Sequence, residues 1–367
     1  MKTAIAGMEE RKRLSNFEAL RLLCMLMILN LHSFWGYQHG SGVWQALDFF
    51  RESTSICAVD CFVLISGYFG IKWKFKSFFN LIFQIFFYSI GIYLVAVGIG
   101  VVNWSFMEFA LRFACLFTSS WGFVINYIIL YFCAPVLNVF SENKTSRELL
   151  IYIIVFFVAI NFVSLPESSF FTYALVYLIG RFLNKINIST IEYPARKAYW
   201  GATVIIFLLV YGLLYKTLHI SDPKTINKLP IGVLGFAYSS PFVILQAVFL
   251  FICFARMNFY SKIINWCAAS SFAIFLIHMH PTIKKIGYYS FTSELYELPV
   301  LQHILYLILL IIFVFFMSIA VDKIRLLVSN FLYHILETLI KLIPSKWKSI
   351  DTFIPSVVKQ VINVINK

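Results

Sequence analysis

Charged residues are scarce in this chain of 367 residues. Asp, Glu, Lys and Arg make up 13% of it, hydrophobic residues make up 60%, and there are 40 phenylalanines. Soluble globular domains carry about 25% charged residues, so this composition excludes an ordinary soluble domain. The apolar segments are also too long and unbroken for the roughly ten-residue alternating strands of a membrane β-barrel. The sequence therefore predicts an all-α fold, a polytopic bundle of transmembrane helices that satisfy their own backbone hydrogen bonds in lipid.

Linkers, repeats and ligand-like cysteine patterns are also missing. No Pro- or Ser-rich stretch divides the chain, no repeat relates its two halves, and the loops between apolar segments reach only 16 to 20 residues. We therefore expect any chemistry to take place within the helices or at the mouth of a cavity between them. Among the seven cysteines, Cys57 and Cys61 lie one helical turn apart and are interpreted as packing residues. Neither a metal site nor a structural disulfide is expected.

Ten apolar segments are candidate transmembrane helices. Two of them are short, so the number of spans is predicted only to within one or two. The segments are 17–37, 54–71, 77–100, 121–141, 148–165, 170–184, 198–218, 236–256, 267–282 and 300–322. The stretch 104–118 carries Glu108 and Arg112 four residues apart and is predicted to be an interfacial helix. The predicted domains are a membrane domain over 1–326 and an amphipathic tail on the membrane surface over 327–367.

The basic residues of the chain indicate its orientation. The net charge is +13, and with ten spans 22 of the 30 Lys and Arg lie on the side of the amino terminus, seven lie on the other side and Arg21 lies within the first span. The positive-inside rule then predicts that both termini are cytosolic. Basic loops beside an anionic leaflet account for this charge without a nucleic-acid partner. The first apolar run has no small-residue cleavage site, which predicts a retained span instead of a removed signal peptide.

Three polar residues interrupt that first apolar run: Glu18, Arg21 and His32. Their spacings of three and eleven place them on one stripe of a helix. A charged arginine near the centre of a bilayer costs about 2.5 to 3.5 kcal/mol, so the stripe should face other helices or water. With Arg13 at the inner boundary, Arg21 lies roughly 12 Å deep and His32 roughly 28 Å along the helix, near the outer edge. The stripe is predicted to be functional; the alternative is an ion pair that joins helices and a histidine bonded to a carbonyl.

Five stretches of the chain form an ordered set of motifs. The first is NFEALRLLCMLMILNLH at 16–32, with its Arg-to-His spacing of eleven. The other four are VDCFVLISGYF at 59–69, WGFVINYIILYFCAPVLN at 121–138, YLIGR at 177–181 and SSFAIFLIHMHP at 270–281. In these motifs and their order the sequence resembles the acyltransferase 3 family of integral membrane acyltransferases. The resemblance implies transfer of an acyl group, usually acetyl, from cytosolic acetyl-CoA to a hydroxyl of a cell-surface or exported polysaccharide, or its lipid-linked precursor, at the plasma membrane.

On this resemblance His32 is the catalytic residue, either as a general base on the acceptor hydroxyl or as a transiently acylated relay; the sequence does not choose between them. Arg21 would contact the phosphates of the donor or the developing oxyanion. Glu18 would hold Arg21 in place, for which a plain ion pair is the favoured interpretation. Asp60, an acid at the outer end of the second span, would orient His32 or bind a sugar hydroxyl, and a merely hydrated carboxylate is equally expected.

Further candidates would bind the substrates. Lys72, Lys74 and Lys76 form a predicted basic mouth for acetyl-CoA, although family members often carry an arginine pair there and ordinary anchoring explains the lysines equally well. Trp121 and Tyr127 would stack on sugars, with an aromatic belt as the alternative. His278 would bind substrate, although a hydrogen bond to the backbone near Pro281 is favoured.

A transporter is the alternative from another class. Glu18, Asp60 and His32 would then form a proton relay for a small polar solute or a lipid-linked sugar. Transporters of this kind show two related halves with broken spans in corresponding places. The chain shows no such halves, so an O-acetyltransferase is the preferred prediction. The oligomeric state is not predicted.

Overall fold

The computed structural model describes residues 14–33, 43–116, 121–163, 169–190, 192–217 and 235–341. These residues form helices joined by short turns, with no β-strand among them. The helices are α1 (Ser15–His32), α2 (Val43–Ser55), α3 (Ala58–Phe69), α4 (Phe75–Gly98), α5 (Phe106–Phe113), α6 (Gly122–Glu142), α7 (Ser146–Val163), α8 (Phe170–Lys185), α9 (Ala195–Phe207), α11 (Pro241–Ala255), α12 (Lys262–Ala268), α13 (Ser271–His278), α14 (Pro281–Ile283), α15 (Tyr289–Glu294) and α16 (Val300–Lys341). The predicted all-α class is confirmed for this part of the chain.

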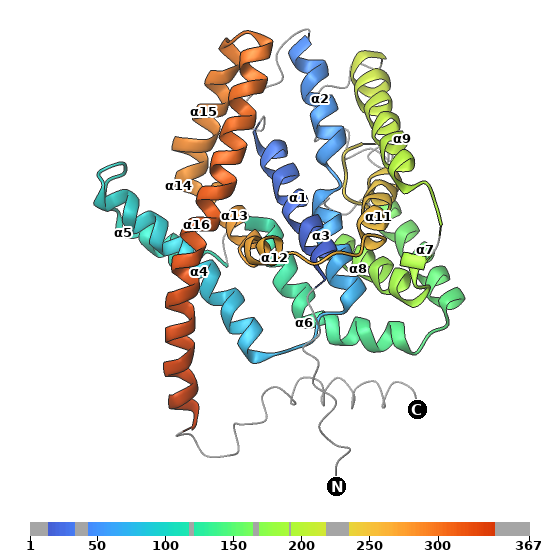
Figure 1. Cartoon of the computed structure of the whole chain (residues 1–367), viewed down its shortest axis with the longest axis horizontal. Coiled ribbons are helices and arrows are strands. Elements are labelled where there is room, and N and C mark those ends of the chain that lie inside the picture. Colours follow the sequence, from blue (N-terminus) through green and yellow to red (C-terminus); the bar gives the residue numbers. More distant parts are fainter. Residues whose placement is uncertain are drawn as a thin grey trace.

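Within the described residues, four helical segments are long and apolar enough to cross a bilayer. They are α4, α6, α9 with its π-helical continuation to Thr217, and α16 over Val300–Ile335. The bent pair Lys262–His278 and Pro281–Glu297 gives a fifth candidate. The predicted ten spans are therefore not confirmed as ten long helices. Some predicted spans hold shorter helices: the span predicted over 54–71 holds α3, of 12 residues, which follows α2 after a two-residue break (Figure 1).

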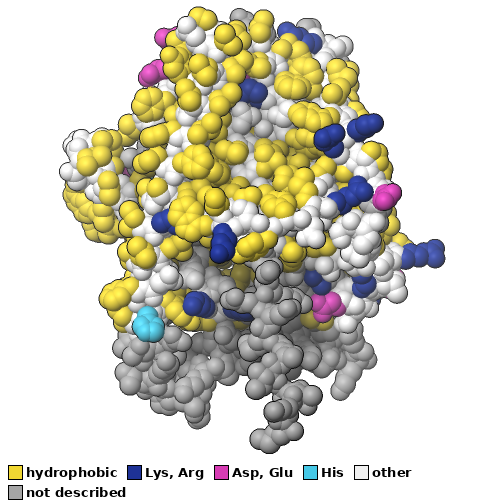
Figure 2. All heavy atoms as spheres, viewed as in Figure 1, with side chains coloured by type: hydrophobic (Ala, Val, Ile, Leu, Met, Phe, Trp, Pro, Cys, Tyr) yellow, Lys and Arg dark blue, Asp and Glu magenta, His cyan; other side chains and the backbone are white. Residues whose placement is uncertain are grey.

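The surface of the bundle is apolar. Hydrophobic side chains cover most of the described part of the face that Figure 2 shows. Large apolar residues of α4, α7 and α16 are exposed at the surface of the bundle. Exposed apolar area of this extent is typical of a surface that contacts lipid. The helix predicted within 104–118 is α5, where Glu108 and Arg112 form the predicted ion pair at 2.6 Å. The protein is thus a helical membrane protein.

Helices α3 and α8 make the closest backbone approach that bears on the site. A Cβ atom on Gly67 would lie 2.2 Å from the carbonyl oxygen of Tyr177, and one on Gly180 would lie 2.6 Å from that of Leu64. Only glycine fits at these two points. Small residues let membrane helices approach until their backbones touch, which maximises van der Waals contact. Gly67 and Gly180 therefore permit the close approach of α3 and α8.

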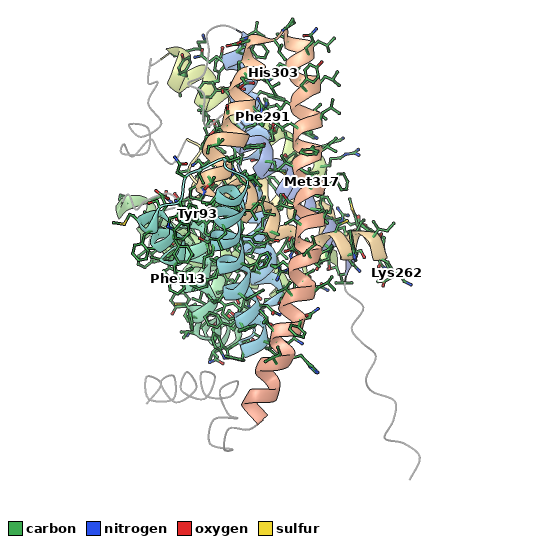
Figure 3. The ribbon with its side chains drawn as sticks, turned by 90° about the vertical axis from the view of Figure 1, so that its left-hand side faces the viewer. Tyr93, Phe113, Lys262, Phe291, His303 and Met317 are labelled. Carbon is green, nitrogen blue, oxygen red and sulfur yellow. The ribbon has the colours of Figure 1, made fainter. Side chains whose placement is uncertain are left out.

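The bend between α13 and α14 is the main irregularity near the carboxyl-terminal half of the bundle. The two halves of the bent pair differ in direction by 60°. Pro281 begins α14 and disfavours helical geometry at the residue before it, and His280 caps α14 by accepting a hydrogen bond from Thr282 N at 3.2 Å. Helix α13 therefore ends at His278. Figure 3 shows α12, which starts at Lys262, lying crosswise to the long helix α16.

Helix α16 is longer than predicted and buries an ion pair. Its 42 residues continue without a break past the predicted domain boundary at 326, and its lower end projects from the bundle (Figure 1). Arg325 is 3% exposed and donates from Nε to Asp322 Oδ1 at 2.6 Å. Tyr88 of α4 donates to the same carboxylate at 2.7 Å. The guanidinium is therefore buried beside a carboxylate of its own helix, and α4 supplies that carboxylate with a second donor. The remainder of the predicted tail, 342–367, lies outside the described residues.

The α3–α8 contact predicts how glycine substitutions affect stability. We expect Gly67→Ala to lower the free energy of unfolding by about 1 to 3 kcal/mol, because the added methyl group collides with the backbone of α8. Gly91→Ala in α4 is the matched control, since its Cβ would meet no atom within 4 Å and alanine favours a helix by about 1 kcal/mol over glycine. Thermal unfolding in detergent measures both. Equal stability of the two variants would contradict the packing argument.

Candidate active site

Two histidines from opposite ends of the sequence meet inside the bundle. His32 is the last residue of α1 and His278 is the last residue of α13. Their Nδ1 and Nε2 atoms, respectively, are 2.7 Å apart, which is hydrogen-bond distance. His32 is 6% exposed and His278 is 1% exposed. We call these two residues the histidine pair.

The imidazole of His278 is held on its other side by its own helix. Its Nδ1 lies 2.5 Å from the carbonyl oxygen of Ile274, one turn earlier in α13. The ring also packs edge-on against Phe275 and Tyr288, and the hydroxyl of Tyr288 donates to the carbonyl oxygen of Leu29 in α1 at 2.6 Å. The contact to Ile274 agrees with the predicted backbone bond, but the sequence did not predict the contact with His32. His278 is therefore fixed in both position and ring orientation.

Glu18 and Arg21 form an ion pair at the other end of the α1 stripe. Arg21 donates from a terminal nitrogen to Glu18 Oε1 at 2.8 Å. The Glu18 side chain is 5% exposed, whereas that of Arg21 is 27% exposed, so the guanidinium retains access to its surroundings. Eleven residues of helix separate Arg21 from His32 by roughly 16 Å. The stripe thus carries a charged, accessible group and a buried imidazole about three turns apart.

Asp60 lies apart from the histidine pair. It is in the first turn of α3 and is fully buried. In the part of the chain that the structure describes, neither carboxylate oxygen has a hydrogen-bond partner, and no bond joins it to His32. Buried polar groups are almost always bonded to protein, water or ligand. Asp60 is therefore a group whose partner must come from something other than the described side chains.

Lys72 and Lys74 lie on the segment that leads from α3 to α4, and Lys76 lies in the first turn of α4. All three are exposed. This segment is held by the Tyr131 hydroxyl, which bonds the backbone of Lys74 at 3.3 Å, while the Lys76 ammonium sits 4.5 Å from the ring centre of Tyr333. Lys72, Lys74 and Lys76 thus form an exposed basic segment beside α6 and α16.

The aromatic candidates differ in exposure. Trp121 is 2% exposed, and its indole N–H donates to the carbonyl oxygen of Met279 at 3.1 Å. It therefore supports the end of α13. Tyr127 is partly exposed, and its hydroxyl lies 3.3 Å from the Ser66 hydroxyl. Of the two, Tyr127 has the more accessible ring.

A cluster around Arg51 holds the end of α1 that carries His32, and the sequence analysis missed it. Arg51 donates to Asn30 Oδ1 at 3.1 Å and to the Ser33 hydroxyl, and it pairs with Asp48 at 2.8 Å. Asp48 also accepts from the Tyr296 hydroxyl at 2.8 Å. The spacing of three residues between Asp48 and Arg51 was the sequence signal that could have predicted this ion pair, because residues three apart share a helix face. These five residues, the Arg51 cluster, supply polar partners at the last turn of α1, where helix carbonyls lack them.

The Arg51 cluster predicts a large effect on stability. We expect Arg51→Ala to lower the free energy of unfolding by about 3 kcal/mol, because the fully buried Asp48 carboxylate loses its counter-charge. Arg112→Ala is the control: its side chain is equally buried, but its partner Glu108 is 49% exposed, so a loss of about 0.2 to 1 kcal/mol is expected. Chemical unfolding in detergent measures both. Equal losses would show that the cluster is not a special support of α1.

The comparisons with known proteins agree with this arrangement. A family model described as an acyltransferase domain, that of the acyltransferase 3 family, matches residues 14–322. The matched region runs from α1 into α16 and includes every candidate residue described above. No curated protein and no solved structure matches the chain. Because the family model covers most of its length, the chain belongs to the acyltransferase 3 family of membrane acyltransferases.

Proposed function

We propose that this protein is an O-acetyltransferase. It transfers acetyl from acetyl-CoA to a hydroxyl of a cell-surface or exported polysaccharide or of its lipid-linked precursor. The single observation that carries the proposal is the buried histidine pair at one end of the helix whose other end presents Arg21. An imidazole buried among helices and bonded to a second imidazole is suited to proton transfer or to nucleophilic attack, and family membership supplies the acyl group.

His32 acts by one of two routes. In the first, an unprotonated nitrogen of His32 takes the proton of the acceptor hydroxyl while the oxygen attacks the thioester carbon. The C–O ester bond forms, the C–S bond breaks, and the proton passes to the departing thiolate of CoA. In the second, the nitrogen itself attacks the thioester carbon, so that a C–N bond forms, the C–S bond breaks and CoA leaves as its thiolate. The hydroxyl oxygen then attacks the acetyl carbon, the C–O ester bond forms, the C–N bond breaks, and the hydroxyl proton ends on the CoA thiolate. Both routes need an imidazole nitrogen without a proton.

Donor binding is assigned to the Arg21 end of the stripe. The planar guanidinium bonds phosphate or oxyanion groups through two parallel N–H donors. Glu18 keeps it in place through the 2.8 Å ion pair. The exposed Lys72, Lys74 and Lys76 attract the phosphates of acetyl-CoA electrostatically. On this proposal the donor enters from the cytosol, both termini are cytosolic and the membrane is the plasma membrane.

Acceptor binding is assigned to polar and aromatic groups of α3, α6 and α13. The partly exposed ring of Tyr127 offers a face for stacking on a sugar. Trp121, the residue before α6, and His278, the last residue of α13, border this region. The unbonded carboxylate of Asp60 is able to accept hydrogen bonds from sugar hydroxyls.

The proposal predicts that His32→Ala abolishes acetyl transfer. Membrane vesicles are supplied with radiolabelled acetyl-CoA on the cytosolic face and host glycan on the other, and label in the glycan is counted. We expect a loss of at least about 100-fold for His32→Ala, because both routes begin at this imidazole. His334→Ala, which changes an exposed histidine of α16, is the control and should retain wild-type transfer.

Either of two results would overturn the proposal for His32. One is full transfer by His32→Ala in protein that is inserted and folded. The other is no label transfer by the wild type together with pH-dependent passage of a polar solute across the vesicle, which would favour a transporter.

Arg21→Lys is expected to weaken donor use by about 10- to 100-fold in kcat/KM, the equivalent of one strong charge-assisted hydrogen bond. Lysine keeps the charge but presents a point donor instead of a planar fork. The same vesicle assay, run over a range of acetyl-CoA concentrations, measures the effect. Arg112→Lys is the control for a general loss of arginine. Wild-type kinetics for Arg21→Lys would reduce Arg21 and Glu18 to a pair that joins helices.

A further inference from the structure

The hydrogen bonds of the histidine pair form a directed chain. The chain runs from the carbonyl oxygen of Ile274 to Nδ1 of His278 at 2.5 Å, and from Nε2 of His278 to Nδ1 of His32 at 2.7 Å. All three residues are buried. The backbone carbonyl at one end of this chain of hydrogen bonds fixes the direction in which each proton points.

A carbonyl oxygen only accepts hydrogen bonds, so Nδ1 of His278 must carry a proton and donate it. A neutral imidazole has one N–H, which leaves Nε2 of His278 as an acceptor. The only proton available for the 2.7 Å contact is then on Nδ1 of His32. Neutral His32 is thereby held in the tautomer with Nδ1 protonated and Nε2 unprotonated.

We propose that His278 is a positioning residue that sets the tautomer of His32 and so makes Nε2 the reactive nitrogen. This inference rests on the proposed function, and it deepens that function by naming the reacting atom. In the first route Nε2 takes the proton of the acceptor hydroxyl, and in the second it attacks the thioester carbon. In both, the Nδ1 proton of His32 stays on Nδ1 and continues to donate to His278.

The fixed end of the chain distinguishes this arrangement from a carboxylate support. A carboxylate at the far end of such a chain would add a negative charge and favour the protonated imidazole over the neutral one. The Ile274 carbonyl is neutral and belongs to the helix that carries His278. It orients the proton without adding a full charge. His278 is the last residue of α13, and Ile274 lies one helical turn earlier. This last turn before the break at Pro281 fixes the geometry of the bond between them.

Nitrogen NMR tests the tautomer without relying on activity. Protein labelled with ¹⁵N-histidine is placed in lipid nanodiscs, and the His32 signals are identified by their loss in His32→Gln. We expect Nδ1 of His32 to appear as a protonated nitrogen and Nε2 as an unprotonated one. A protonated Nε2 in neutral wild-type His32 would overturn the inference, whatever the protein is found to catalyse.

Two substitutions of His278 test the positioning role. His278→Phe keeps a ring of similar size but offers no acceptor, so we expect kcat to fall at least 100-fold while the KM for acetyl-CoA changes less than twofold. His278→Gln places an amide oxygen near the position of Nε2 and should stay within about tenfold of the wild-type kcat. In the NMR spectrum, His32 should lose its single tautomer in His278→Phe and keep it in His278→Gln.

The outcomes separate the inference from the proposed function. Wild-type kcat in folded His278→Phe would overturn the positioning role even if acetyl transfer is confirmed. A wild type that moves no acetyl group, but whose His32 shows the expected tautomer, would overturn the proposed function and leave the hydrogen-bond chain established. If His278→Phe does not fold, His278→Gln and the wild-type spectrum decide the matter.

Discussion

Inside an apolar bundle, buried polar side chains need partners within the protein, and several of them find these partners on another helix. Gln246 of α11 shows it plainly: its amide donates to the Ser53 carbonyl oxygen at 2.8 Å and to the Thr203 hydroxyl at 2.7 Å, joining three helices. Asn30 bonds the Ser55 hydroxyl across α1 and α2 in the same way. An unbonded polar group in a low-dielectric interior costs several kcal/mol. The polar residues therefore determine which apolar helices are neighbours.

Two departures from regular helix place the chemical groups. After α3, Gly70 has a φ of 71°, a conformation that few other residues adopt without strain, and the chain turns there into the lysine segment. That turn is held by the Tyr177 hydroxyl, which accepts from Ile71 N at 2.8 Å. The break at Pro281 ends α13 at His278. Without these two interruptions the basic segment and the second imidazole would lie elsewhere on longer helices.

The two ends of α1 have different surroundings. At the amino-terminal end Arg21 is paired but partly accessible, which suits a group that contacts a charged, exchanging ligand. At the carboxyl-terminal end, the Arg51 cluster holds the last turn of α1 and His278 bonds His32. A buried base in a fixed orientation loses little free energy to reorganisation when it reacts. One helix therefore carries an accessible, paired guanidinium at one end and a buried imidazole at the other.

The sequence by itself determined the features that depend on composition and local spacing. The all-α class followed from apolar segments that lipid admits only as helices, and the Glu18–Arg21 and Glu108–Arg112 pairs followed from spacings of three and four, since such residues share a helix face. Only the tertiary structure brought together His32 and His278, which are 246 residues apart. It also showed that Arg325 is buried beside Asp322, whose carboxylate accepts a hydrogen bond from Tyr88 of another helix. Contacts between distant segments depend on which helix faces pack together, and that is decided by the fit of the whole bundle.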